Sequence, residues 1–296
     1  MSSYSKNAVS VGEKWLPYQK AESEHHFIVH SVFDKVINLS TVNCDLLSVT
    51  ASGIGKASGF LSLPCKSLDL GVTAGEKCSS QAGRLILGAS SINFSEAPVW
   101  KGPINKEYRH KSIKSENVAA FKAVLDRLAP PESAWRYISN GYAGSVGYSG
   151  SAYNTAAKGS SGPGGSFAGL TSIKDLHKDP ALLRNLIGLG MGLTPAGDDM
   201  ILGFLAVINH TCENTKYIDK LHNAVSSSIK KTVDISGKVL ANALDCDYHE
   251  VLQNCLRDLC EGEREDIYIS AASLLSLGAS SGLDIATGMY FGMWVD

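Results

Sequence analysis

The segment Gly188-Leu-Gly-Met-Gly-Leu-Thr-Pro-Ala-Gly-Asp-Asp199 begins where one predicted helix ends and stops inside the next one. Its first three glycines, at a spacing of two, allow unusual φ values and a close approach of the backbone to a ligand. Thr194 is a good N-cap residue, and Pro195 suits the first position of a helix. The segment therefore predicts a tight turn between two helices, with two carboxyl groups in the first turn of the second helix.

Helical patterns continue on both sides of this segment. Upstream, Asp179 and Pro180 mark the start of a short helix that Gly188 ends. We therefore expect a mainly α-helical domain over residues 171–296. Downstream, apolar residues at helical spacing predict helices over about 195–211, 214–231, 234–245, 248–260, 264–277 and 282–294.

The N-terminal part of the chain has a different texture. Its apolar runs are short and are bounded by glycine, proline and serine, which is typical of strands joined by turns. We therefore expect a mainly antiparallel domain over residues 25–110, resembling a β-barrel or sandwich, so that the fold class is α+β. The polar residues 1–24 are expected to form an arm. The apolar runs are residues 27–29, 36–39, 46–50, 59–63 and 85–87.

Two segments separate the predicted domains. Residues 111–139 predict a connecting helix, because Phe121, Val124 and Leu128 fall on one helical face and prolines follow it. Residues 140–170 are rich in glycine and serine. This composition favours either a mobile linker or a lid whose backbone amides meet an anion.

The overall composition excludes several classes of partner. Lys and Arg total 27 and Asp and Glu total 29, so the net charge of −2 argues against a surface for nucleic acid. No segment has the apolar character of a signal peptide or a membrane span, so we expect no membrane partner. The seven cysteines include no C-x-x-C pair, which predicts reduced thiols in a cytoplasmic protein.

A further segment, Leu277-Gly-Ala-Ser-Ser-Gly-Leu-Asp-Ile-Ala-Thr-Gly288, repeats part of the first. The spacing Gly197-x-Asp-x-x-x-Gly203 recurs as Gly282-x-Asp-x-x-x-Gly288. We interpret the segments as two copies of one device whose helix N-termini converge on one ligand. The alternative is that small residues here only allow close helix packing. Convergence requires the carboxyl groups of Asp199 and Asp284 to lie within about 15 Å, the reach of a small ligand.

The residue types at these helix starts suggest several kinds of chemistry. A helix N-terminus favours phosphate or carboxylate, whereas carboxyl groups beside it would repel a bare anion. The acids are therefore candidates for catalysis, for orienting a donor group or for holding Mg²⁺; helix capping is the structural alternative. Candidate catalytic residues are Asp198, Asp199 and Asp284, with Asp198 and Asp199 as possible Mg²⁺ ligands. Candidate substrate or phosphate contacts are Gly188, Gly190, Gly192, Thr194, Gly197, Ser280, Ser281 and Gly282.

Two other places receive structural interpretations. Thr232 and Ser236 flank a predicted helix start, which helix capping explains. The stretch Asp245-Cys-Asp-Tyr-His249 contains metal-binding residue types, but we expect it to join two helices.

The segment over 188–199 resembles the signature G-L-G-x-G-L-T-P-S-G-D-D of the AllH-like family, with Met191 and Ala196 as departures. The segment over 277–288 is similar to the family's block S-S-G-x-D followed by Gly. The stretch Asn93-Phe-Ser-Glu-Ala-Pro-Val-Trp-Lys-Gly-Pro103 is similar to the one that closes the family's N-terminal part.

This resemblance implies a function in carbamoyl transfer. The family contains a subunit of oxamate carbamoyltransferase, which moves a carbamoyl group between oxalurate and phosphate in allantoin breakdown. It implies that the glycine segment holds phosphate or carboxylate, while the three aspartates orient carbamoyl NH groups or hold Mg²⁺. It also implies partner protein subunits and a small anionic substrate. Two alternatives are a non-catalytic accessory or sensor subunit that binds a small anion, and a scaffold protein.

Overall fold

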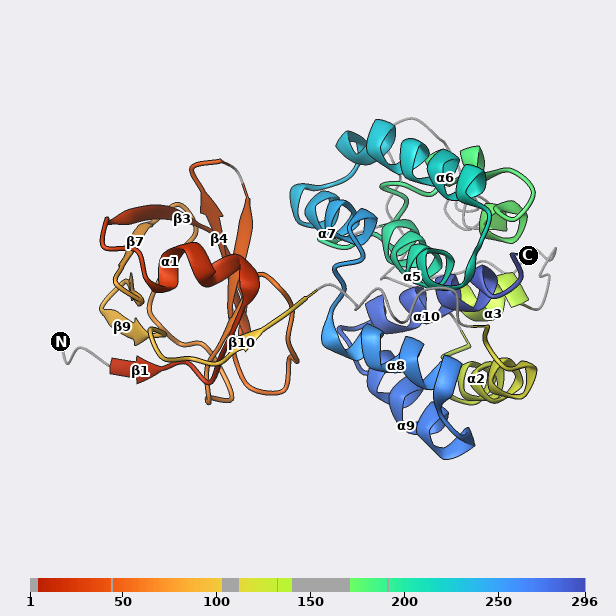
Figure 1. Cartoon of the computed structure of the whole chain (residues 1–296), viewed down its shortest axis with the longest axis horizontal. Helices are drawn as coiled ribbons and strands as arrows, with labels where there is room; N and C mark the ends of the chain where they lie inside the picture. Colours follow the sequence, from red (N-terminus) through yellow and green to blue (C-terminus); the bar gives the residue numbers. More distant parts are fainter. Residues whose placement is uncertain are drawn as a thin grey trace. The chain divides into compact units, whose positions relative to one another are not determined.

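The computed structural model describes residues 5–43, 45–102, 112–131, 133–139, 171–190 and 192–295. The chain divides into two compact units (Figure 1). The β-unit comprises Met1–Pro103 and Asp247–Glu250, and the helical unit comprises Ile104–Cys246 and Val251–Asp296. This division confirms the α+β prediction. Among the described residues, no helix combines the length and the apolar character needed to cross a membrane.

The described part of the β-unit forms one ten-stranded sheet that curls into an open half-barrel (Figure 1). Its strands are β1 (Ser5–Asn7), β2 (Ser10–Gly12), β3 (His25–Val32), β4 (Val36–Thr41), β5 (Leu46–Thr50), β6 (Phe60–Ser62), β7 (Lys77–Gln81), β8 (Arg84–Leu87), β9 (Ser90–Asn93) and β10 (Val99–Trp100). Their order is β1-β9-β8-β7-β3-β4-β5-β6-β2-β10. Pairing is antiparallel except for β1–β9, β2–β10 and β5–β6, so the mainly antiparallel prediction is confirmed.

The expected N-terminal arm is wrong for residues 5–19. These residues form β1, β2, the short helix η1 (Glu13–Trp15) and α1 (Leu16–Gln19). Trp15 is fully buried, its ring lies 5.4 Å from that of Phe94, and its Nε1 donates to the Gly59 carbonyl at 2.8 Å. The prediction failed because three-residue strands are too short to show an alternating pattern.

A short segment from late in the chain also belongs to the β-unit. Asp247 is buried, accepts a hydrogen bond from the Ser58 hydroxyl, and pairs with Lys14 Nζ at 3.0 Å. A Cβ atom at Gly102 would overlap the Asp247 carboxyl, so only glycine allows this approach. Residues 247–249 are therefore more than a connection between helices, because Asp247 contributes a buried carboxyl and a partly exposed ion pair to the β-unit.

The helical unit is organised around two central helices, α5 (Ala196–Thr211) and α10 (Ser281–Gly292), which pack against each other (Figure 1). Nearly all of α5 is buried, so its apolar residues lie on all sides, as in a core helix. The other helices are α2 (Ser115–Leu128), α3 (Ala134–Ser139), η3 (Thr171–Asp175), η4 (Pro180–Asn185), α6 (Thr215–Ser228), η5 (Ile229–Lys231), α7 (Asp234–Leu244), α8 (Glu250–Glu261) and α9 (Arg264–Leu275).

The predicted helices agree with these bounds, with some corrections. Residues 180–185 form a 3₁₀ helix, with the Asp179 side chain capping it as expected. The described residues of the predicted connecting helix over 111–139 form α2 and α3 and belong to the helical unit. The expected end of the β-domain at residue 110 lies outside the described residues. The glycine- and serine-rich segment 140–170 lies outside the described residues.

Glycines set the distance between α5 and α10. A Cβ atom at Gly203 would overlap the carbonyl oxygen of Ile285, and one at Gly288 would overlap that of Met200. The two contacts are reciprocal, because each glycine faces the residue three positions before its counterpart. Close packing by small residues is therefore confirmed for this pair, and it forces the backbones together.

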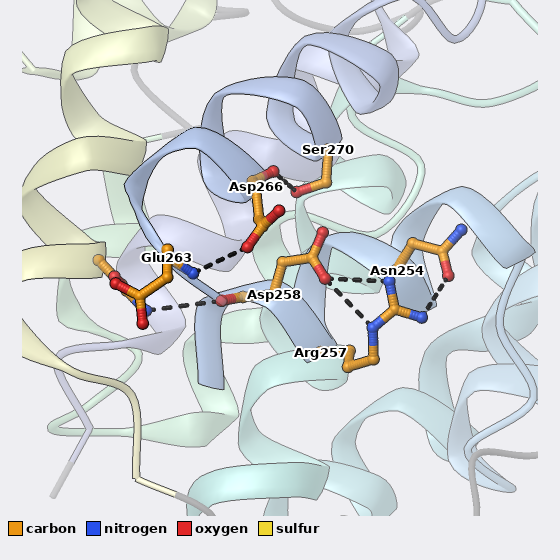
Figure 2. A network of polar contacts seen from close by, with 7 residues as sticks. Asn254, Arg257, Asp258, Glu263, Asp266 and Ser270 are labelled. Atoms are coloured by element: carbon orange, nitrogen blue, oxygen red, sulfur yellow. Dashed lines mark hydrogen bonds and ion pairs between the residues drawn. The ribbon is translucent and has the colours of Figure 1, made fainter. Parts of the chain in front are cut away.

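Polar contacts fix the turn between α8 and α9 (Figure 2). The backbone N–H of Glu263 donates to the Asp266 carboxyl at 2.9 Å, which forms a capping box at the start of α9. Asn117 on α2 donates to the carbonyls of Leu259 and Gly262, at 3.0 and 3.2 Å. A hollow of about 370 Å³ beside this turn contains none of the predicted site residues.

Candidate functional site

The two glycine-rich segments meet at the start of the central helices. Thr194 directly precedes the N-cap of α5, and Ser281 begins α10. Their hydroxyl oxygens lie 2.9 Å apart and share a hydrogen bond. Both hydroxyls also hydrogen-bond to the carboxyl group of Asp199. The predicted role of Thr194 as N-cap is corrected, since Pro195 takes that position and the Thr194 side chain crosses to the other segment instead.

Asp199 is the most unusual group at this junction. Only 4 % of the residue is exposed, and its Oδ2 atom has no hydrogen-bond partner among the described residues. Its pKa is raised to about 8, chiefly by burial; the nearby acids Asp284 and Asp198 also raise the pKa, while the hydroxyls of Ser281 and Thr194 lower it. Asp199 is therefore mainly a neutral carboxylic acid at pH 7.

Asp198 has a different environment, although it is the adjacent residue. Its Oδ1 accepts the Gly188 backbone N–H at 2.8 Å. Its Oδ2 accepts the hydroxyls of Thr232 and Ser236, the latter at 2.7 Å. The chain's own donors thus occupy both carboxyl oxygens, and the side chain ties the glycine segment to the start of α7. Interpreting Thr232 and Ser236 as helix caps was wrong, because α7 has no side-chain cap.

Asp284 lies in the first turn of α10 and is fully buried. Its charge acts on Asp199, which places the carboxyl groups of the two copies in one electrostatic environment. The sequence prediction that both acids lie at the same junction agrees with this arrangement.

In both copies a backbone N–H group that the sequence suggested as an anion donor instead donates to a carbonyl oxygen of the protein. Gly197 donates its N–H to the Leu189 carbonyl at 2.8 Å, and Gly282 donates to that of Leu277 at 2.9 Å. A Cβ atom at either glycine would overlap a carbonyl oxygen of the preceding turn. The φ values of the glycines at 188, 190 and 192 are +75°, +122° and +89°, in the region that favours glycine. Ser280 is the N-cap residue of α10, and its side chain makes no capping bond.

The geometry also bears on the possible Mg²⁺ ligands. Among the described residues, no group of three or more His, Cys, Asp or Glu side chains is placed to hold a metal ion. Of the two expected ligands, Asp198 has both oxygens engaged by the protein, whereas Asp199 keeps one oxygen for a further partner.

Comparison with models of known protein families identifies the family of this chain. A family model described as oxamate carbamoyltransferase subunit AllH matches residues 186–293, and a model of the AllH family N-terminal domain matches residues 7–99. Together the two matches cover more than half of the chain. The chain belongs to the AllH family. Searches of curated proteins and of solved structures returned no match.

Membership of the AllH family covers the whole candidate site. The match over residues 186–293 contains both glycine-rich segments, and with them Asp198, Asp199 and Asp284. It also contains Thr232 and Ser236, which had no predicted functional role. The description of the family as a subunit indicates that AllH chains work with partner chains.

Proposed function

We propose that this chain is a subunit of a transferase that moves a carbamoyl group between oxalurate and phosphate, as part of allantoin breakdown. The family description supports this proposal, because it names the enzyme and describes the chain as a subunit. The observation that carries the site is the buried carboxyl of Asp199, which lies where the two motifs meet and keeps one oxygen without a partner.

The chemistry is a group transfer to phosphate. A phosphate oxygen attacks the carbamoyl carbon of oxalurate, the bond from that carbon to the oxamate nitrogen breaks, and that nitrogen takes the proton of the phosphate. The products are carbamoyl phosphate and oxamate. Negative charge develops on the carbamoyl oxygen during attack, and fixed hydrogen-bond donors stabilise such charge.

Each residue of the site has a distinct part in this proposal. Asp199, with the hydroxyls of Thr194 and Ser281, contacts and orients the substrate. Burial keeps the Asp199 carboxyl protonated, and the nearby Asp284 adds to this effect. Asp198 is a positioning residue, because it fixes the Gly188 backbone and touches only the protein's own donors. Partner subunits complete the active enzyme.

The test is turnover by the assembled enzyme. The chain is combined with its partner subunits, and carbamoyl phosphate formed from oxalurate and phosphate is measured with and without Mg²⁺. Asp199→Asn is expected to lower kcat by about 100-fold or more, the order of effect of losing one preorganised hydrogen-bonding group in an active site. Asp219→Asn, at an exposed position on α6, is the matched control and should leave kcat unchanged.

Three results would contradict the proposal. The absence of turnover with the partner subunits present would contradict the transferase assignment. Full activity of the Asp199→Asn variant would show that the active site does not lie where α5 and α10 begin. If turnover requires the chain and is nevertheless insensitive to both Asp199→Asn and Ser281→Ala, the chain is an accessory subunit.

A further inference from the structure

The free oxygen of Asp199 identifies which part of a substrate this junction would hold. We propose that the α5–α10 junction binds the amide NH₂ of a carboxamide, the carbamoyl end of the substrate, and that phosphate binds elsewhere in the assembled enzyme. The proposal rests on the proposed function and assigns one site to one chemical group.

The first argument is the hydrogen-bonding state of Asp199. The hydroxyls of Thr194 and Ser281 bond to its carboxyl and to each other, and these three bonds need one proton more than the two hydroxyls supply. The third proton is that of the neutral Asp199 carboxyl, so Oδ2 is the carbonyl oxygen of the acid; it has no partner and lies out of contact with water. A buried polar atom without a partner destabilises the protein unless a ligand complements it. The group that complements a carboxyl oxygen is an N–H or O–H donor. An amide NH₂ supplies such a donor, whereas a carboxylate ligand presents only acceptors.

The second argument is the charge around the site. The charged groups that act on Asp199 are the carboxyls of Asp284 and Asp198, and both are buried. A phosphate brought to this place would meet these carboxyls, and no cation is among the groups that shift the pKa of Asp199. An uncharged amide avoids this repulsion.

The third argument concerns the backbone donors that would bind an anion. Gly197 and Gly282 each donate their N–H to a carbonyl oxygen of the preceding turn, and Gly188 donates to Asp198. These three amides therefore have protein acceptors already. The helix starts consequently provide fewer free N–H groups for phosphate than the sequence suggested.

A carboxamide also matches the neighbouring hydroxyls. In the pair formed by Thr194 and Ser281, either oxygen can act as the donor. A carboxamide carries an NH₂ donor and a carbonyl acceptor on one planar group, so it can pair with Asp199 and with a hydroxyl at the same time. The ligand class is therefore a small carbamoyl or carboxamide compound, such as oxalurate, carbamoyl phosphate or oxamate.

The decisive probes are oxamate and oxalate, because they differ only in an amide NH₂ replaced by a carboxylate oxygen. Binding of each to the full chain is measured at pH 7 by calorimetry and by the shift in Tm. Oxamate is expected to bind about ten- to a hundredfold more tightly than oxalate, the effect of one hydrogen bond to a buried polar group. Inorganic phosphate alone is expected to give no shift that depends on Asp199.

Two variants locate the effect. Asp199→Asn should lower the oxamate-to-oxalate preference severalfold, to the part that the extra charge of oxalate contributes, and Asp219→Asn should leave the preference unchanged. Ser281→Ala retains the Asp199 carboxyl, so it should weaken oxamate binding severalfold while keeping the preference. Urea unfolding of each variant shows that it is folded, and Ser281→Ala keeps the test informative if Asp199→Asn unfolds.

Several outcomes would overturn the assignment. Equal binding of oxamate and oxalate, tighter binding of oxalate, or no binding of oxamate at all each contradicts the amide site. If phosphate binds to the unchanged chain and Asp199→Asn abolishes this binding, the junction is an anion site. These results leave the proposed function standing if the assembled enzyme turns over oxalurate. A preserved oxamate preference without turnover would instead refute the transferase and keep the amide site.

Discussion

Replacement of Asp199 by Asn should change how the stability of the helical unit depends on pH. The pKa of Asp199 is raised from its ordinary value of 3.8 to about 8 by burial. Between these two pH values the folded protein keeps a proton that the unfolded chain releases. Stability therefore falls as pH rises through this window, and the full loss is reached above the folded pKa. Asn has the same shape and carries no such proton, so its contribution should be independent of pH.

The size of the effect follows from the shift. About three pH units of the window lie between pH 5 and pH 8, and each unit corresponds to about 1.36 kcal/mol. The free energy of unfolding of Asp199→Asn, relative to the unchanged chain, should therefore rise by about 4 kcal/mol from pH 5 to pH 9.

Urea unfolding followed by far-UV circular dichroism reports on this unit, because its signal comes mainly from helix. The measurement is made at pH 5, 7 and 9 on the unchanged chain, on Asp199→Asn and on the exposed control Asp219→Asn. The control should follow the unchanged chain at each pH. A difference between Asp199→Asn and the unchanged chain that stays within about 1 kcal/mol across the range would refute a buried neutral carboxyl.

Four further substitutions test the buried contacts and the packing. Ser236→Ala should lower the free energy of unfolding by about 1–3 kcal/mol in urea, because it removes a donor from the buried Asp198 carboxyl. Gly203→Ala should lower Tm strongly, since its Cβ would overlap a carbonyl oxygen, whereas Gly237→Ala has 3.6 Å of space and should be neutral or stabilising by up to about 1 kcal/mol. Trp15→Ala should cost the β-unit about 3–5 kcal/mol, measured by thermal unfolding, and an unchanged Tm would place the residue outside the core.

The sequence predicted long elements better than short ones, for a physical reason. Helix α5 has a proline before it and apolar residues throughout, so its start and length were visible. The five predicted apolar runs correspond to β3, β4, β5, β6 and β8. Strand β7 was missed, because its sequence Lys-Cys-Ser-Ser-Gln buries only a thiol and one serine and shows no apolar alternation.

For the candidate site, the sequence indicated which segments meet and missed what holds them. The shared spacing around Asp199 and Asp284 predicted a common junction, because equal spacing on two helices places equivalent residues alike. The contacts of Thr232 and Ser236 with Asp198 could not be predicted, since they join positions more than thirty residues apart in the sequence and depend on how α7 packs on α5.

Close packing by small residues and convergence of the two helix starts, first offered as alternatives for the repeated motif, occur together. Gly203 and Gly288 allow α5 and α10 to approach until backbone meets backbone, and this approach brings the two helix starts together. The copies then differ in their polar residues. Thr194 corresponds to Ala279, and Ser281 corresponds to Ala196, so each copy supplies the hydroxyl that the other lacks. Close packing of the two helices requires the glycines but does not require a hydroxyl in one copy where the other has alanine. We therefore interpret the complementary pattern, centred on the Asp199 carboxyl with its unpartnered oxygen, as favouring a shared ligand site.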